Sequence, residues 1–151
     1  MTAQPEDNNP PRGRGAKAIQ DWVQAQLTSG KPRGPLYLAL LRAPIPDDMD
    51  ELDALSAARD SLGDVLVDRN TEGITAEKRG DQVRAIALYE ANVADQFDGS
   101  HPYERLRIIY AGLERYPDAI RVCEAYLQHV AQDPKRCESF RRWLDKYRQE
   151  C

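Results

Sequence analysis

Cysteine and histidine are the residues of this chain best suited to act as nucleophiles or metal ligands, but their spacing supports neither role. A zinc site usually needs one close pair of ligands followed by a second pair. Cys123, Cys137 and Cys151 include no Cys-x-x-Cys pair, and only His101 and His129 accompany them. The odd number of cysteines fits no closed disulfide framework, which favours a reducing compartment. We therefore expect no metal site and no cofactor.

Each of these side chains has a structural interpretation instead. Cys123 lies on an apolar stripe and is expected to be a small buried hydrophobe. His101 precedes Pro102 at an expected helix start, where it can serve as a cap. His129 lies near an expected helix C-terminus, where positive charge is favourable. Because no nucleophile has a neighbouring base, we expect no catalytic residues and predict that the chain is not an enzyme.

Two further segments contain residue types found in ion- and phosphate-binding loops. The acidic segment 47–53 lacks the glycine and the terminal glutamate of a calcium loop. Asp47 and Asp48 follow Pro46 and are better explained as caps of a helix. The Arg-Gly-Arg-Gly segment at 12–15 lacks the preceding strand and the lysine of a phosphate-binding loop. Neither segment predicts a ligand site.

Length and composition limit the class of protein. The 151 residues leave room for one domain, or for one domain and a tail. A share of 41% apolar residues is enough for a core, and the net charge of -4 argues against a dedicated nucleic-acid binder. The sequence contains no signal-peptide core and no run of about 18 apolar residues that could span a membrane. We expect a cytoplasmic protein without a membrane partner.

The first part of the chain divides into a tail and a group of helices. Residues 1–15 are rich in proline, glycine, asparagine and charge, and are expected to form a disordered tail. Residues 16–65 are predicted to hold accessory helices. These are one helix from about 16 to 27, a short helix at 36–41 and a third that follows the acidic segment.

The second half of the chain contains an internal repeat. Ala119 lies one 34-residue period after Ala85, and the same shift places Ile108 over Ile74. Apolar residues recur there at helical spacing in stripes expected to face the core. These stripes are Val83, Ile86, Val93 and Phe97; Leu106, Ile109, Tyr110 and Leu113; Ile120, Cys123, Leu127 and Val130; and Cys137, Phe140, Leu144 and Tyr147.

Particular residue types also recur at fixed places in the two units of this repeat. The second unit carries Tyr103, Leu106, Tyr110, Tyr116 and Ala119, and the first carries Gly73, Gly80, Asp81, Ala85 and Tyr89. This pattern resembles the tetratricopeptide repeat, whose unit is a pair of helices of about 34 residues. Arg69 and Glu72 depart from it in the first unit, and Arg107 replaces a small residue in the second.

The resemblance implies an all-α fold with a short solenoid of helical hairpins over residues 66–151. The last stripe has no second helix after it, so it is expected to be a capping helix at the end of the array. Two repeats bury little surface, since about three are usually needed. The accessory helices at 16–65 are therefore expected to pack against the first unit and complete the core.

The resemblance also implies a function, which is protein or peptide binding by an adaptor or scaffold module. In such arrays the first helix of each unit lines a concave groove. Carried over residue by residue, the groove positions are Asn70, Ile74, Glu77, Lys78, His101, Glu104, Ile108, Lys135, Glu138 and Arg142. The expected partner is another protein or a peptide, and the oligomeric state is left open.

Two alternatives to an adaptor remain at this stage. The C-terminal segment is basic and interleaved with aromatic residues, so it could contact the phosphates of a nucleic acid. Its cations and aromatics are Lys135, Arg136, Arg141, Arg142, Trp143, Lys146, Tyr147 and Arg148. Trp143 and Tyr147 are four residues apart, however, and pack inward in the simplest interpretation. The second alternative is a structural protein that forms oligomers.

Overall fold

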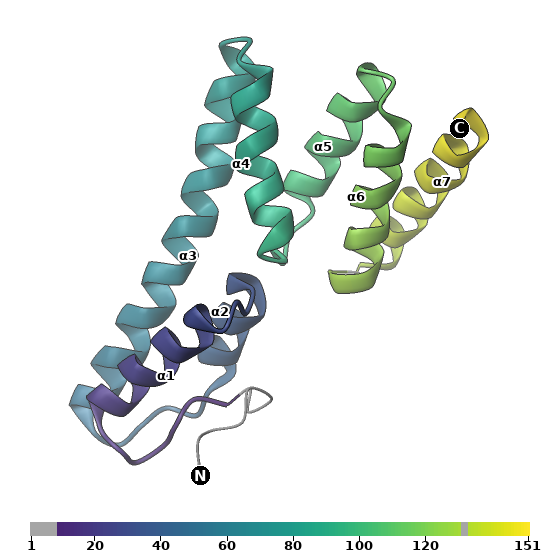
Figure 1. The fold of residues 1–151 in the computed structure, drawn as a ribbon. Coiled ribbons are helices and arrows are strands. Elements are labelled where there is room, and N and C mark those ends of the chain that lie inside the picture. Colours follow the sequence, from purple (N-terminus) through teal and green to yellow (C-terminus); the bar gives the residue numbers. More distant parts are fainter. Residues whose placement is uncertain (1–8, 131–132) are drawn as a thin grey trace. The chain divides into compact units, whose positions relative to one another are not determined.

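The computed structural model describes residues 9–130 and 133–151, and within them the chain is helical throughout, without a strand (Figure 1). This confirms the predicted all-α fold class. The helices are α1 (Ala16–Thr28), α2 (Arg33–Arg42), α3 (Met49–Lys78), α4 (Gln82–Ala94), α5 (His101–Gly112), α6 (Tyr116–His129) and α7 (Pro134–Glu150).

The chain forms two compact units, Met1–Val67 and Asp68–Cys151. The boundary falls inside α3, which continues through it as one helix. The sequence divides accessory helices from repeats at residues 65 and 66, which also lie within α3. No proline interrupts α3, so nothing in the sequence breaks the helix there.

The first unit has a core made by α1, α2 and the N-terminal part of α3. Ile19 and Trp22 of α1 are buried, and Val23 and Leu27 pack against the same core. The other buried members are Leu36, Leu40, Ala54, Leu55 and Leu62. The short helix expected at 36–41 is present within α2.

The segment before α1 is tied to the start of α3. The N–H groups of Gly13 and Gly15 donate to the carboxylate of Glu51, at 3.2 and 2.5 Å. Of the disordered tail predicted over residues 1–15, residues 1–8 lie outside the described residues. The last residues of that segment instead make specific hydrogen bonds.

The second unit alternates helices in direction. The last part of α3, α5 and α7 run one way, and α4 and α6 run the opposite way (Figure 1). Aspartate side chains cap two of these helices. Asp81 accepts a hydrogen bond from the Arg84 N–H at 3.1 Å, and Asp133 accepts one from the Lys135 N–H at 3.0 Å.

The loops between α3 and α4 and between α5 and α6 have the same hydrogen bonding, one repeat period apart. The N–H of Asp81 donates to the carbonyl of Ala76, and the N–H of Arg115 donates to the carbonyl of Tyr110, both at 2.8 Å. In each loop the preceding residue is left-handed, Gly80 with φ 77° and Glu114 with φ 58°. This is the arrangement of a Schellman motif, which ends a helix and turns the chain back. The same motif also ends α1 and α4, where the N–H of Lys31 donates to the carbonyl of Gln26 and the N–H of Phe97 to that of Asn92.

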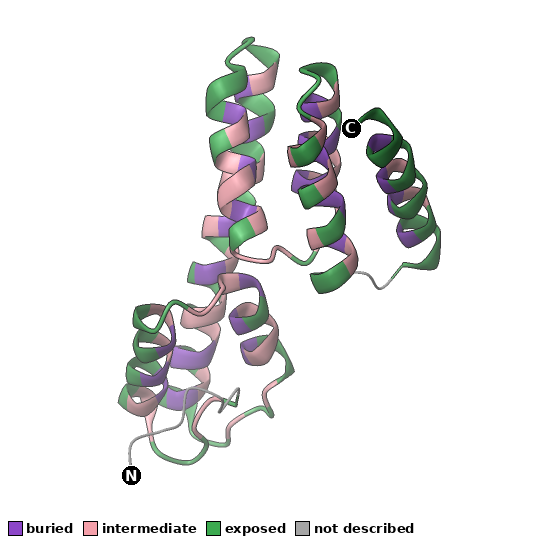
Figure 2. Ribbon diagram, turned by 45° about the vertical axis from the view of Figure 1, so that its right-hand side comes forward, coloured by how far each residue is buried: buried purple, intermediate pink, exposed green. Residues whose placement is uncertain are grey.

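Two of the four predicted apolar stripes lie in or against the core of the second unit. All four residues of the last stripe, Cys137, Phe140, Leu144 and Tyr147, are buried. Figure 2 shows that buried residues of α7 keep to one side of the helix and that the opposite side is exposed. Cys123 of α6 and Val130, its C-cap, are buried, with Ile120 and Leu127 packed against the same core.

Two residues of the remaining stripes were predicted to be buried, and this is wrong. Val83 is 81% exposed, because α4 turns Ala85, Tyr89 and Asn92 inward instead. Leu113 is 45% exposed, because α5 ends at Gly112 and Leu113 is already its C-cap.

The close approach of α3 and α4 depends on a glycine. A β-carbon on Gly73 would lie 2.5 Å from Cε1 of Tyr89, closer than any ordinary contact. Tyr89 is fully buried and fills the space that the missing side chain leaves.

Candidate binding surface

The ten residues predicted to line a groove lie on three helices of the second unit. α3 carries Asn70, Ile74, Glu77 and Lys78, α5 carries His101, Glu104 and Ile108, and α7 carries Lys135, Glu138 and Arg142. None of the ten is buried. On each helix they recur at intervals of three or four residues, which places them along one stripe. We call these three stripes together the binding surface.

An ion pair joins the stripes of α3 and α5. The guanidinium of Arg105 donates to both carboxylate oxygens of Glu77, with Nη2 2.7 Å from Oε1 and Nε 3.1 Å from Oε2. Such bidentate pairs are geometrically specific. Burial alone would raise the pKa of the Glu77 carboxyl, but hydrogen bonds from Arg105 and Tyr89 outweigh it and lower that pKa. Glu77 is therefore held as a carboxylate.

Tyr89 and His101 complete the cluster around Glu77. The Tyr89 hydroxyl donates to Glu77 Oε2 at 2.6 Å, and the rings of Tyr89 and His101 meet edge to face at 5.5 Å. Desolvation lowers the pKa of His101, Arg105 lowers it further, and Glu77 acts in the opposite direction. His101 Nε2 is buried without a hydrogen-bond partner among the described residues. These facts describe a neutral imidazole that packs at the joint between the two hairpins.

A second arginine joins α5 to α7. The Arg107 Nη1 donates to the Tyr147 hydroxyl at 2.9 Å, its guanidinium carbon lies 4.3 Å from the centre of the Trp143 ring, and it pairs with Glu104. The side chain is buried. Stacking on the ring and the pairing with Glu104 both compensate for the loss of water around the charge.

The two predicted acids of α3 and α5 are thus engaged within the protein, and so is Asn70. The Oδ1 of Asn70 accepts from Nδ2 of Asn92 at 2.9 Å, next to the 2.5 Å ion pair of Arg69 and Asp95. Asn70 is therefore oriented by the α3–α4 hairpin.

The remaining residues of the surface are free to meet a partner. Ile74 and Ile108 are 37% and 40% exposed. Lys78, Lys135 and Arg142 are exposed, and their side chains form no ion pair or hydrogen bond within residues 9–130 and 133–151.

Other cations of α7 have partners. Arg136 donates to Ser100 Oγ at 2.7 Å, Arg148 lies 3.5 Å from the Glu124 carboxylate, and Lys146 stacks on Trp143 at 5.1 Å. The basic character of the segment is therefore partly used in holding α7 in place.

Sequence reasoning missed Arg105 and misjudged Arg107. Arg105 lies three residues before Ile108 on the same face of α5, so the helical period could have placed it on the surface. Arg107 was treated as a departure from the family pattern at a small-residue position. A charged residue at a register that should be buried indicates a specific partner, and here the partners are Glu104, Trp143 and Tyr147.

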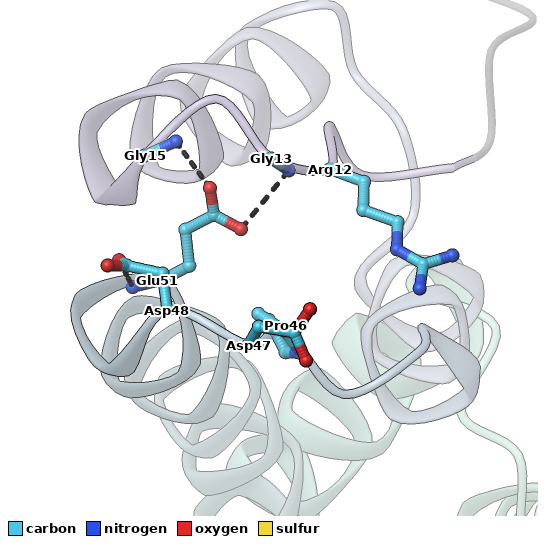
Figure 3. A pocket seen from close by; sticks show the side chains of 7 residues that line it. All are labelled: Arg12, Gly13, Gly15, Pro46, Asp47, Asp48 and Glu51. Atoms are coloured by element: carbon cyan, nitrogen blue, oxygen red, sulfur yellow. Dashed lines mark hydrogen bonds between the residues drawn. The ribbon is translucent and has the colours of Figure 1, made fainter.

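The first unit contains a hollow of about 390 Å³ between the segment before α1 and the start of α3 (Figure 3). Its lining is Arg12, Gly13, Gly15, Pro46, Asp47, Asp48 and Glu51. The Glu51 carboxylate points at the backbone of Gly13 and Gly15, whereas Arg12 extends away from it (Figure 3). Asp48 caps α3 by accepting from the Glu51 N–H at 2.9 Å, as predicted for this acidic segment. Two of these acids thus have structural partners.

No family model, curated protein or solved structure matches the chain. Within the described part of the chain, no helix combines the length and the apolar character needed to cross a bilayer. Across the same residues, no three His, Cys, Asp or Glu side chains gather where they could hold a metal ion.

Proposed function

We propose that residues 68–151 are a short tetratricopeptide-like array that binds a protein or peptide. The support for the class is the repeat period, which appears both in residue types and in the paired loops after Ala76 and Tyr110. The small residues Ala85 and Ala119, which occupy equivalent positions in the two sequence repeats, are fully buried. A two-helix unit of this length is the unit of that repeat.

The observation that carries the binding proposal is the exposure of Ile74 and Ile108. They occupy the same position in consecutive sequence repeats and lie on stripes that the Glu77–Arg105 pair joins. Contiguous apolar patches rimmed by polar residues are typical of interaction sites, whereas single exposed aliphatic residues are common, so the proposal depends on one partner covering both isoleucines. A partner that covers both isoleucines would remove apolar surface from water, which favours association.

The proposed role of α7 is to end the array. Its buried face packs on α6, with the rings of Phe140 and Tyr126 stacked at 4.0 Å. Its opposite face is charged, as expected of a terminal repeat that meets water rather than another unit.

We propose binding rather than catalysis, and the low reactivity of the buried Cys123 thiol supports this. Burial raises the pKa of the Cys123 thiol to about 12, so it holds little thiolate at neutral pH. The free, buried thiols of Cys123 and Cys137 fit a reducing compartment such as the cytoplasm.

A library of random 12-residue peptides with acetylated and amidated ends, applied to the immobilised full chain, tests the proposal. We expect a retained pool that Ile108→Lys and Ile74→Lys each deplete at least about tenfold, since a charge would enter an apolar contact. Leu113→Lys is the matched control, because Leu113 is similarly exposed but lies at the end of α5. A chain that retains no peptide, or one whose pool survives both isoleucine changes, would refute the proposal.

A further inference from the structure

The free charge of the binding surface differs in sign from the net charge of the whole chain. The chain has a net charge of -4. On the surface, however, Glu77 and Glu104 are already neutralised by Arg105 and Arg107. A carboxylate whose oxygens accept from an internal guanidinium offers little attraction to a cationic partner.

Three unpaired cations remain on the surface against one unpaired carboxylate. The cations are Lys78, Lys135 and Arg142, and the carboxylate is Glu138, all exposed and without an ion pair among the described residues. His101 adds no charge at neutral pH, because burial lowers the pKa of its imidazole. The free charge that a partner would meet is therefore positive.

The cations lie at defined places relative to the isoleucines. Lys78 follows Ile74 by four residues and so neighbours it on α3. The repeat shift that carries Ile74 onto Ile108 carries Ile108 onto Arg142 of α7. The Arg107–Tyr147 hydrogen bond holds α5 and α7 together. Across α3, α5 and α7, one equivalent position is thus isoleucine, isoleucine and arginine.

We infer that the partner is an acidic protein segment in which one or two aliphatic residues stand beside side-chain carboxylates. This inference rests on the proposed binding function and names the chemistry of its ligand. The aliphatic residues cover Ile74 and Ile108, and the carboxylates pair with Arg142 and Lys78. Arginine suits this contact because its planar guanidinium matches a carboxylate.

The surface favours a protein segment over a nucleic acid. Single-stranded nucleic acids bind through exposed aromatic rings on which bases stack. On α7, Arg107 and Lys146 lie over the ring of Trp143, and Tyr147 is buried. The exposed apolar side chains of the surface are instead the aliphatic Ile74 and Ile108, which offer a base no ring on which to stack.

The composition of the retained peptides tests this inference with the full chain. The library draws every position equally from Asp, Glu, Lys, Arg, Leu, Val, Ser and Gly, and its blocked ends exclude a contribution from a terminal carboxylate. We expect the retained pool to be enriched in Asp and Glu next to Leu and Val. Arg142→Glu should weaken binding of the most enriched peptide about tenfold at low salt, and less at 1 M salt.

Arg141→Glu is the matched control. Arg141 is an exposed neighbour of Arg142, rotated by about 100° around the helix. The Arg141→Glu substitution makes the same change of charge away from the binding surface, so it should alter binding less than about twofold.

The possible outcomes are distinct. A retained pool enriched in Lys and Arg, or one indifferent to charge, overturns the acidic ligand while leaving peptide binding intact. If Arg141→Glu and Arg142→Glu weaken peptide binding equally, the acidic ligand is also overturned. If a 20-nucleotide single-stranded RNA displaces the peptides at lower concentration than the peptides themselves do, the ligand is not a protein segment. Retention of no peptide at all is the failure of the proposed function, not of the ligand class alone.

Discussion

Gly73 of α3 and Tyr89 of α4 are in such close contact that a single added carbon would collide with the ring. A β-carbon on Gly73 would lie 2.5 Å from Cε1 and 2.8 Å from Cζ of Tyr89. The ring is also fixed at its other end, because its hydroxyl donates to Glu77. The glycine is thus required by packing and not by backbone conformation, since it lies in the middle of a helix.

The first prediction concerns this contact. Gly73→Ala should lower the free energy of unfolding by about 1–3 kcal/mol, the usual cost of overpacking a core. Gly112→Ala is the matched control, because Gly112 is also helical and nothing lies within 4 Å of an added β-carbon. There the alanine should be neutral or stabilise by up to about 1 kcal/mol. Urea unfolding of both variants measures the difference, and equal effects would show that α3 and α4 are less closely packed.

The second prediction separates the core from the surface on one helix. Leu106 is fully buried, so Leu106→Ala should cost about 2–5 kcal/mol. Ile108 is two residues away and 40% exposed, so Ile108→Lys should change the free energy of unfolding by no more than about 0.5 kcal/mol. Denaturant melts of the two variants decide this. If Ile108→Lys unfolds the protein and Leu106→Ala does not, the register of α5 is wrong.

The third prediction concerns the response of stability to pH. The pKa of His101 is lowered in the folded protein below its ordinary 6.5, chiefly by desolvation. The unfolded chain therefore takes up a proton before the folded protein does as the pH falls. The free energy of unfolding should decrease as the pH falls from above about 6.5 toward the folded pKa, because stability rises with pH where the unfolded state binds more protons.

His101→Gln removes that titration, so its free energy of unfolding should fall less between pH 7.5 and 5.5. If the free energy of unfolding of this variant falls as steeply with pH as that of the original protein, the imidazole of His101 is not held neutral in the folded state. The carboxylate of Glu77 acts at lower pH. Its pKa is held below 4.5, so its contribution is present above that value and disappears as the pH falls through the folded pKa.

The fourth prediction concerns the segment that Glu51 holds. The Gly13 and Gly15 N–H groups both donate to this buried carboxylate, so Glu51→Ala should release the segment. Trypsin should then cleave after Arg12 and Arg14 several times faster, because an ordered backbone resists cleavage. Asp50→Ala is the control, since Asp50 is exposed in the same turn of α3. Equal cleavage rates in the two variants would show that the hydrogen bonds to Glu51 do not order the segment.

Periodicity and turn chemistry made much of the helical order predictable from the sequence. The stripe from Cys137 to Tyr147 indicated the buried face of α7, and Asp81 and Asp133, residues of a type that prefers the N-cap, stand at the starts of α4 and α7. Gly30, with φ 85°, ends α1 as its residue type indicates. These features depend on neighbouring residues alone, and so a single sequence is enough to predict them.

Features that depend on contacts distant in the sequence were not predictable in the same way. Val83 belongs to an apolar period, but α4 buries Ala85 and Tyr89 because Gly73 of another helix makes room for the ring. Arg107 looked like a defect of the pattern, because its stacking partner Trp143 belongs to a different helix. The stripes of the binding surface were predictable from the helical period of the sequence. The pairing of Glu77 with Arg105 was not, because it depends on how two helices lie relative to one another.

The packing of Trp143 also makes α7 separately observable. The chain has two tryptophans, Trp22 in the first compact unit and Trp143 in the second. A Trp22→Phe protein would emit from Trp143 alone, whose ring is in contact with a guanidinium, an ammonium group and a phenol. Its emission maximum should shift to the red when α7 leaves α6, while Trp143→Phe would leave only the signal of the other unit. Comparison of the two fluorescence melts would reveal whether the units lose their structure in one transition or in two.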